Sequence, residues 1–75
     1  MKSKFFYIKS ELNGKVLDIE GQNPAPGSKI IIWDQKKGPT AVNQLWYADQ
    51  QGIIRSKLND LVIDASKEGK GSFVS

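Results

Sequence analysis

The chain has 75 residues, a formal net charge of +3 and neither cysteine nor histidine. One small domain is the most that this length allows, and disulfide bridges and zinc sites are excluded as sources of stability. The basic residues are scattered, with Lys36-Lys37 as the single adjacent pair, whereas a nucleic-acid-binding surface requires a basic stripe with interleaved aromatic residues. We therefore expect no nucleic-acid partner, no metal and no cofactor.

The N-terminal sequence MKSKFFYIKSE has only the short apolar run FFYI between Lys4 and Lys9. A signal peptide requires an apolar core of about 7–15 residues, and a membrane helix requires about 18 or more. The sequence therefore predicts no leader and no membrane insertion. The absence of cysteine slightly favours a cytoplasmic, reducing compartment.

Short apolar runs rich in β-branched residues alternate with turn-forming residues along the chain. This pattern is typical of an all-β protein, here with about six to seven short antiparallel strands. The strands are predicted in residues 5–10, 15–19, 29–33, 44–48, 52–56 and 61–65. Asn13-Gly14 favours a tight hairpin turn after the first strand, because both residues tolerate positive φ. Loops are predicted at the Pro/Gly-rich residues 20–28 and at residues 35–41.

The sequence contains an internal repeat. Residues 7–20, YIKSELNGKVLDIE, align without a gap with residues 53–66, IIRSKLNDLVIDAS. The chain therefore comprises one full unit of about 46 residues, residues 5–49, followed by a truncated second unit, residues 52–75. A unit that cannot bury its own apolar face must stack against copies of itself, so we expect self-association or a longer parent chain to complete the fold. The identical pairs are Ile8/Ile54, Ser10/Ser56, Leu12/Leu58, Asn13/Asn59, Val16/Val62 and Asp18/Asp64.

Gln44 and Trp46 form a candidate structural motif. They are two residues apart, and in a strand this spacing places both side chains on the same face. Trp46 is expected to fill the core, and the Gln44 amide is expected to satisfy backbone groups at a turn that would otherwise be buried unpaired. We interpret the pair as a motif that holds the end of the repeat in place.

The order of these segments resembles the ricin B-type lectin family. A VLDI strand, a Pro/Gly-rich loop, an IIIW strand, a polar loop and NQLW follow one another, as in a family repeat of four strands that ends in Gln-x-Trp. The resemblance covers residues 5–49 as one repeat and residues 52–75 as the first part of a second. It implies a single, partial lectin domain with an incomplete β-trefoil fold, and binding of galactose or N-acetylgalactosamine.

The resemblance also implies a sugar-binding site at Asp18, Trp33, Asn43 and Gln44. Asp18 would accept hydrogen bonds from sugar hydroxyls, and Trp33 would stack on the sugar ring. Asn43 would contact a further hydroxyl, with Gln44 supporting it. Ile31 stands where the family often has a glutamine, and this departure removes one hydroxyl contact. The residue types suit the ligand, because a sugar offers vicinal hydroxyls on one side and a patch of C–H groups on the other.

Asp64 repeats Asp18 in the second unit. The segment GKGSFVS is similar to a shortened PGSKIII, so residues 71–72 would correspond to residues 27–28. On this alignment the chain stops just before a stacking aromatic residue. We therefore expect an incomplete second site, in which Asp64 has a structural role.

Two functions remain open on the sequence. The first is a carbohydrate-binding module with glycans as partners. The alternative is a structural or protein-interaction fragment that keeps Gln44 and Trp46 but has no sugar affinity, which Ile31 and the missing third repeat favour. Asp18 and Glu20 share a predicted strand face, but no other residues build a catalytic cleft around them. We therefore predict that the chain is not an enzyme.

Overall fold

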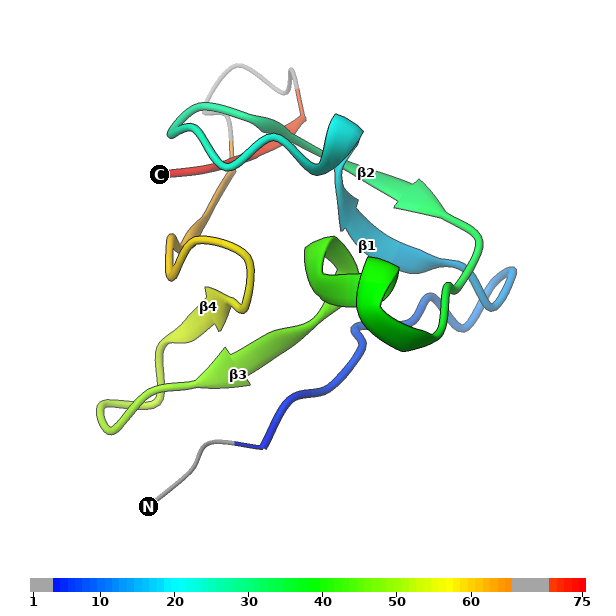
Figure 1. The fold of residues 1–75 in the computed structure, drawn as a ribbon, viewed down its shortest axis with the longest axis horizontal. Helices are drawn as coiled ribbons and strands as arrows, with labels where there is room; N and C mark the ends of the chain where they lie inside the picture. The colour runs from blue at the N-terminus through cyan, green and yellow to red at the C-terminus, as the bar shows by residue number, and fades with distance from the viewer. Residues whose placement is uncertain (1–3, 66–70) are drawn as a thin grey trace.

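The computed structural model describes residues 4–65 and 71–75, so residues 66–70 of the second predicted repeat lie outside the described residues. This part of the chain contains short strands, two 3₁₀ helices and no α-helix (Figure 1). None of its helices has the length and apolar character needed to span a membrane. The all-β prediction is confirmed. The elements are β1 (Val16–Ile19), η1 (Glu20–Gln22), β2 (Lys29–Trp33), η2 (Gly38–Gln44), β3 (Trp46–Ala48), β4 (Ile54–Ser56), β5 (Ile63–Ala65) and β6 (Ser72–Val74).

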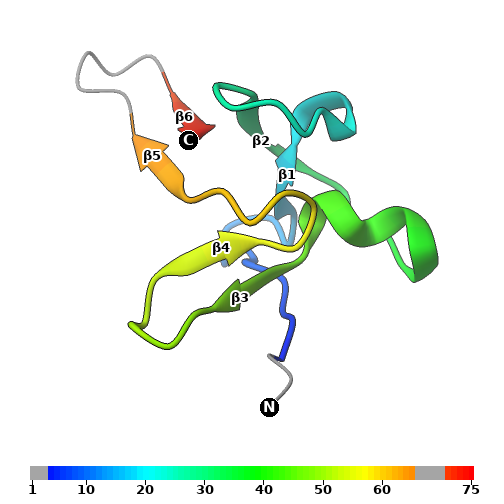
Figure 2. The ribbon, with the colours of Figure 1, turned by 60° about the vertical axis from the view of Figure 1, so that its left-hand side comes forward.

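Two antiparallel hairpins, β1–β2 and β5–β6, join side by side into one sheet with the order β1-β2-β6-β5. The join is formed by β2 and β6, in which Lys29 lies opposite Phe73 and Ile30 opposite Ser72. β3 and β4 form a separate two-stranded sheet, and Figure 2 shows this hairpin apart from the larger sheet. The two repeated units therefore contact each other through equivalent hairpins.

The core lies where these two sheets meet. Ile19, Ile30, Trp46 and Val74 are its buried members, and they come from both units. Trp46 is completely buried in this core. Its indole N–H has no hydrogen-bond partner among the described residues, so the contribution of this side chain is apolar packing.

The predicted first strand, residues 5–10, is wrong as a continuous strand. Phe6 forms an isolated bridge with Trp46, whereas Lys9 forms one with Val16. The segment thus changes partner from β3 to β1 between Phe6 and Lys9, so neither ladder extends into a regular strand.

The predicted strand over residues 44–48 begins later, at Trp46, because η2 extends to Gln44. Gly38 has φ +78° and Pro39 occupies the first turn of η2, where proline is favoured because its missing N–H would have no intrahelical partner. The helix therefore begins inside the predicted polar loop and continues to the first residue of the predicted strand. The expectation that Gln44 and Trp46 share one strand face is wrong, because Gln44 ends a helix and Trp46 begins a strand.

The two hairpins have the same register around the repeated aspartates. Asp18 lies opposite Ile31, and Asp64 lies opposite Phe73. Phe73 therefore corresponds to Ile31.

The same register extends to the next pair in each hairpin. Val16 pairs with Trp33, and Val62 exchanges backbone hydrogen bonds of 3.0 and 2.9 Å with Ser75. Ser75 therefore stands at the place of Trp33. The expectation that an aromatic residue would follow Ser75 as the equivalent of Trp33 is wrong.

The expected alignment of residues 71–72 with residues 27–28 is wrong for the same reason. The pairing of β5 with β6 makes residues 71–72 correspond to residues 29–30. The loop that connects the two strands is shorter in the second hairpin, and an alignment based on the Gly-Ser pair alone does not account for this difference.

Candidate functional site

A pocket of about 430 Å³ opens beside the β1–β2 hairpin. Residues from β1, η1, β2, η2 and the loop between β2 and η2 surround it, and η2 packs directly against β1. The structure brings Asp18, Trp33 and Asn43 together at this pocket. The lining residues are Asp18, Glu20, Gly21, Gln22, Ile31, Trp33, Lys36 and Asn43.

Asp18 is a nearly buried carboxylate in the middle of β1, with 4% of its surface exposed. Its Oδ1 accepts a hydrogen bond of 3.0 Å from Asn43 Nδ2, and its Oδ2 accepts one of 2.8 Å from Gln44 Nε2. An ionised carboxylate offers about four acceptor positions, so about two remain after these bonds. A carboxylate in this position can therefore accept hydrogen bonds from a ligand in the pocket.

The side-chain NH₂ groups of Asn43 and Gln44 donate their hydrogen bonds within the protein. Asn43 Nδ2 donates to Asp18 and, at 3.0 Å, to the Ile19 carbonyl. Gln44 Nε2 donates to Asp18 and, at 2.9 Å, to the Asp34 carbonyl. Each NH₂ group has two donors, so neither amide has a donor left for a ligand.

Gln44 does not line the pocket. Its Oε1 accepts a hydrogen bond of 2.8 Å from the Lys36 backbone N–H, while its Nε2 holds the Asp34 carbonyl. The Gln44 amide therefore satisfies backbone groups of the irregular loop after β2, and it does so from a helix end and not from a strand.

Lys36 is the residue of this network that the sequence reasoning did not identify. Its Nζ donates a 2.8 Å hydrogen bond to Asn43 Oδ1, and an ammonium group has three donors. Within the network of Asp18, Lys36, Asn43 and Gln44, only Lys36 retains unused donors. The sequence offers no local signal for this role, because Lys36 lies in an irregular loop that is positioned by contacts with distant residues.

Trp33 ends β2 and keeps 56% of its surface exposed. Ile31 lies two residues earlier on the same face of the strand, half-buried and opposite Asp18. The pocket therefore combines an exposed indole and an apolar side chain with a buried carboxylate.

Glu20, Gly21 and Gln22 line the pocket from η1. Gly21 and Gln22 both have positive φ, +67° and +53°, which turns the chain away from β1 directly after the strand. Glu20 belongs to this helix, so the expectation that Asp18 and Glu20 share a strand face is wrong.

The second repeated aspartate has different surroundings. Asp64 is exposed, and the Ser75 hydroxyl donates a long hydrogen bond of 3.5 Å to its Oδ2. Ser75, at the place of Trp33, has no ring to stack on a ligand. In the described residues, Asp64 thus lacks the amide and indole neighbours that surround Asp18.

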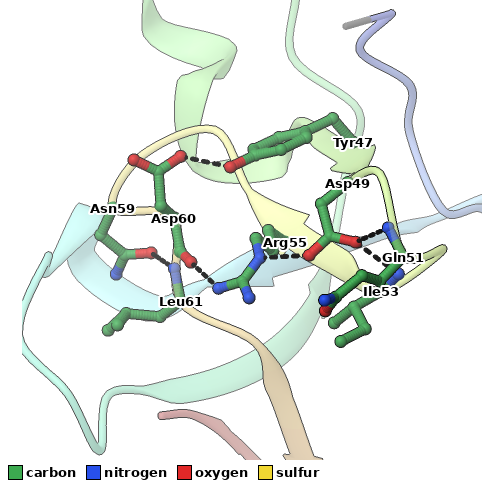
Figure 3. Close-up of polar contacts among 8 residues, drawn as sticks. All are labelled: Tyr47, Asp49, Gln51, Ile53, Arg55, Asn59, Asp60 and Leu61. Carbon is green, nitrogen blue, oxygen red and sulfur yellow. Dashed lines mark hydrogen bonds and ion pairs between the residues drawn. The ribbon is translucent and has the colours of Figure 1, made fainter.

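A second polar cluster joins the β3–β4 hairpin to the turn that follows it (Figure 3). Asp49 Oδ2 pairs with Arg55 Nε at 2.7 Å, and the Tyr47 hydroxyl donates a 2.6 Å hydrogen bond to Asp60 Oδ1. The hydrogen bond from Arg55 holds the pKa of the Asp49 carboxyl below its ordinary value of 3.8. The hydrogen bond to Asp60 raises the pKa of the Tyr47 phenol above its ordinary value of 10.0. This cluster does not line the pocket.

Metal ligands are not gathered in the described part of the chain. Within residues 4–65 and 71–75, no group of three or more carboxylate, histidine or cysteine side chains is arranged to hold a metal ion. The candidate site is therefore described by its hydrogen-bonding groups and its exposed indole.

The chain is similar to solved lectin structures. It is 80% identical to the earthworm R-type lectin C-half in complex with GalNAc, with a TM-score of 0.90 over 96% of this chain and 54% of that chain. It is 90% identical to an earthworm lectin C-terminal domain mutant in complex with 6'-sialyllactose, with a TM-score of 0.81 over 84% of this chain and 48% of that chain. The mdaA-1 domain has a TM-score of 0.76 at 26% identity, over 99% of this chain and 47% of that chain. The chain thus spans about half the length of these structures.

The sequence comparisons agree with the structural ones. Mucoricin of Rhizopus delemar is 36% identical over 56 residues, which are 75% of this chain and 37% of Mucoricin. The sequence model of the ricin-type β-trefoil lectin domain matches residues 4–75. The strands and their antiparallel pairing match those of an R-type lectin β-trefoil, which confirms the predicted fold class. The chain belongs to the ricin-type β-trefoil lectin family.

Proposed function

We propose that this chain binds galactose-type sugars, galactose or N-acetylgalactosamine, in the pocket beside β1 and β2. One observation carries the proposal: a buried carboxylate with unused acceptor positions lines the same pocket as a largely exposed indole. Asp18 is 4% exposed and Trp33 is 56% exposed. A buried charge is costly unless it is hydrogen-bonded, and an exposed tryptophan is available for stacking.

Two charged side chains would bind the sugar hydroxyls, Asp18 as the hydrogen-bond acceptor and Lys36 as the donor. Sugar hydroxyls would donate to the free acceptor positions of Asp18 and would accept from the unused donors of Lys36. Lys36 Nζ is held beside the site by its 2.8 Å hydrogen bond to Asn43 Oδ1. A hydroxyl can donate and accept at the same time, so one sugar hydroxyl can satisfy both charged groups. In this arrangement Asn43 and Gln44 act by orienting Asp18.

Trp33 would cover the C–H patch of the sugar ring, and Ile31 would add apolar surface beside it. A few net hydrogen bonds of about 1 kcal/mol each and about 1 kcal/mol from stacking total roughly 4 kcal/mol. This corresponds to a dissociation constant of about 1 mM. We therefore expect weak binding at one site, with high avidity only where several sites act together.

The similar proteins support this choice of ligand. The earthworm R-type lectin C-half, 80% identical to this chain, was solved in complex with GalNAc. The mutant of the earthworm lectin C-terminal domain, 90% identical over 84% of this chain, was solved with 6'-sialyllactose. Both ligands are carbohydrates, which favours a sugar over a protein partner for the pocket of this chain.

The test is a calorimetric or NMR titration of the chain with galactose and N-acetylgalactosamine. Trp33→Ala removes an exposed ring and is expected to abolish detectable binding while leaving the thermal midpoint almost unchanged. Phe5→Ala is the matched control, because it removes a 45% exposed aromatic ring that does not line the pocket. It is expected to leave the dissociation constant unchanged.

Two results would contradict the proposal. Absence of binding by the parent chain at high millimolar sugar would favour the structural or protein-interaction role. Equal losses of affinity in Trp33→Ala and Phe5→Ala would mean that the sugar does not use this pocket.

A further inference from the structure

The loop between β2 and η2 carries Lys36 but has no regular secondary structure. Gln44 holds two of its backbone groups, because its Nε2 donates to the Asp34 carbonyl and its Oε1 accepts from the Lys36 N–H. These bonds fix the N-terminal side of Lys36. They leave its carbonyl to be held by another group.

That group is the Tyr7 hydroxyl, which donates a 2.5 Å hydrogen bond to the Lys36 carbonyl. Tyr7 is half-buried and lies outside the pocket lining. Both of its neighbours are anchored: Phe6 exchanges backbone hydrogen bonds of 2.9 Å with Trp46, and the Ile8 carbonyl accepts one of 3.0 Å from Leu17. The backbone on both sides of Tyr7 is therefore anchored, to β3 and to β1, and from this point the phenol reaches the loop.

We propose that Tyr7 is a positioning residue for the sugar site, which acts through Lys36. The proposal rests on the proposed function, because it concerns how the donor of that site is held. The N–H and the carbonyl of Lys36 are both hydrogen-bonded, so its backbone is held in place. From this backbone position, the Lys36 Nζ donates to Asn43 Oδ1 at 2.8 Å. Without the phenol, the loop loses its bond on the C-terminal side of Lys36, and the ammonium group loses its fixed position relative to Asp18.

The first experiment compares two substitutions that each remove one hydroxyl. Tyr7→Phe is expected to weaken galactose binding by about three- to tenfold, because one intramolecular hydrogen bond contributes about that factor. Tyr47→Phe is the matched control: it removes a hydroxyl with a similar hydrogen bond, 2.6 Å to Asp60, away from the pocket. Its galactose affinity is expected to equal that of the parent. Equal affinities of Tyr7→Phe and the parent would overturn the proposal.

The second experiment separates positioning from general stability by NMR. In Tyr7→Phe, the backbone amide of Lys36 and the side-chain amide of Asn43 are expected to shift and to exchange faster with solvent. The signals of the Asp60 turn are expected to stay in place. Unchanged Lys36 and Asn43 signals, or equal changes across the whole chain, would overturn the proposal independently of any sugar measurement.

The third experiment tests whether Tyr7 acts through Lys36. Lys36→Met removes the ammonium group, and adding Tyr7→Phe to it is expected to change galactose affinity by less than about twofold. A further loss as large as in the parent would overturn the proposal. If the parent binds no sugar at all, the proposed function fails, whereas the NMR comparison still decides whether Tyr7 positions Lys36.

Discussion

Asp18 combines two roles in one side chain. Its oxygens accept hydrogen bonds from two amide groups, and its remaining acceptor positions are available to the pocket. Asparagine in its place would put an NH₂ group where one oxygen now stands. That group would face an amide donor of Asn43 or Gln44, so two donors would meet without an acceptor.

We therefore predict that Asp18→Asn loses both stability and affinity. The mispaired donors should lower the free energy of unfolding by about 1–3 kcal/mol. Loss of the charge should weaken galactose binding by about tenfold or more, because charge-assisted hydrogen bonds are roughly twice as strong as neutral ones. Urea denaturation and calorimetric titration measure the two effects separately.

Asp64→Asn is the matched control for this prediction. The same substitution is made at the equivalent position of the second hairpin, where the carboxylate is exposed and has one long contact with Ser75. Stability and affinity are both expected to stay close to those of the parent. Equal effects of the two substitutions would show that the amide network around Asp18 has no special importance.

At the scale of elements, the two repeated turns use different residues for the same backbone shape. Gly14 has φ +71°, and Asp60, at the equivalent position, has φ +60°. This conformation costs a residue with a side chain about 1–2 kcal/mol. The cost is lower for aspartate, because its short side chain can form local hydrogen bonds. Asp60 is supported there by the Tyr47 hydroxyl at 2.6 Å and by Arg55, which donates to its carbonyl at 3.0 Å. The polar cluster therefore stabilises a turn that glycine would adopt unaided.

The β3–β4 hairpin should make stability depend on pH in the acid range. Arg55 and backbone N–H groups hold the pKa of Asp49 below 3.8 in the folded chain, so this carboxylate contributes stability above about pH 4. The contribution is lost as pH falls through the folded pKa. We predict that Asp49→Asn is less stable than the parent at pH 7, and that the difference shrinks below about pH 4.

Urea denaturation between neutral and acid pH measures this difference. Glu11→Gln, at an exposed position in a turn, serves as the control and should follow the parent at every pH. A constant difference between Asp49→Asn and the parent across the acid range would show that the ion pair does not cause the pH dependence.

At the scale of the whole molecule, the two hairpins are covered unequally. Val74 is completely buried, whereas Ile32, at the equivalent position of the first hairpin, is 43% exposed. The Val74 side chain packs in the core with Ile19, Ile30 and Trp46. The loop of the first unit runs alongside its backbone: Gly27 donates to the Val74 carbonyl at 2.7 Å, and Val74 donates to the Ser28 carbonyl at 2.9 Å. The face around Ile32 has no such cover among the described residues.

We propose that a second copy of the chain covers the Ile32 face at high concentration. Exposed apolar surface next to a sheet favours association. Sedimentation equilibrium is expected to give a mass above the 8.3 kDa of one chain as concentration rises. Ile32→Lys should reduce this association without weakening sugar binding, because Ile32 does not line the pocket. A mass of one chain at every concentration would contradict the proposal.

Local chemistry along the sequence determined much of the architecture. Asn13-Gly14 predicted a turn, and Gly14 adopts the positive φ that such a turn requires. The KIIIW run predicted a strand over residues 29–33, and β2 has these bounds. The burial of Trp46 followed from its size and its apolar character. Each of these features depends on the residue itself and on its neighbours in the chain. Their conformational preferences and apolar character can therefore be inferred from a short segment of sequence.

The tertiary structure alone decided how the candidate site is held together. Gln44 ends a 3₁₀ helix and reaches Asp18, 26 residues away, and Tyr7 reaches the Lys36 carbonyl, 29 residues away. The bridges of Phe6 to β3 and of Lys9 to β1 likewise replaced the predicted first strand. A hydrogen bond between distant residues leaves no periodicity or spacing in the sequence, because its geometry depends on how the hairpins pack and not on the residues next to either partner.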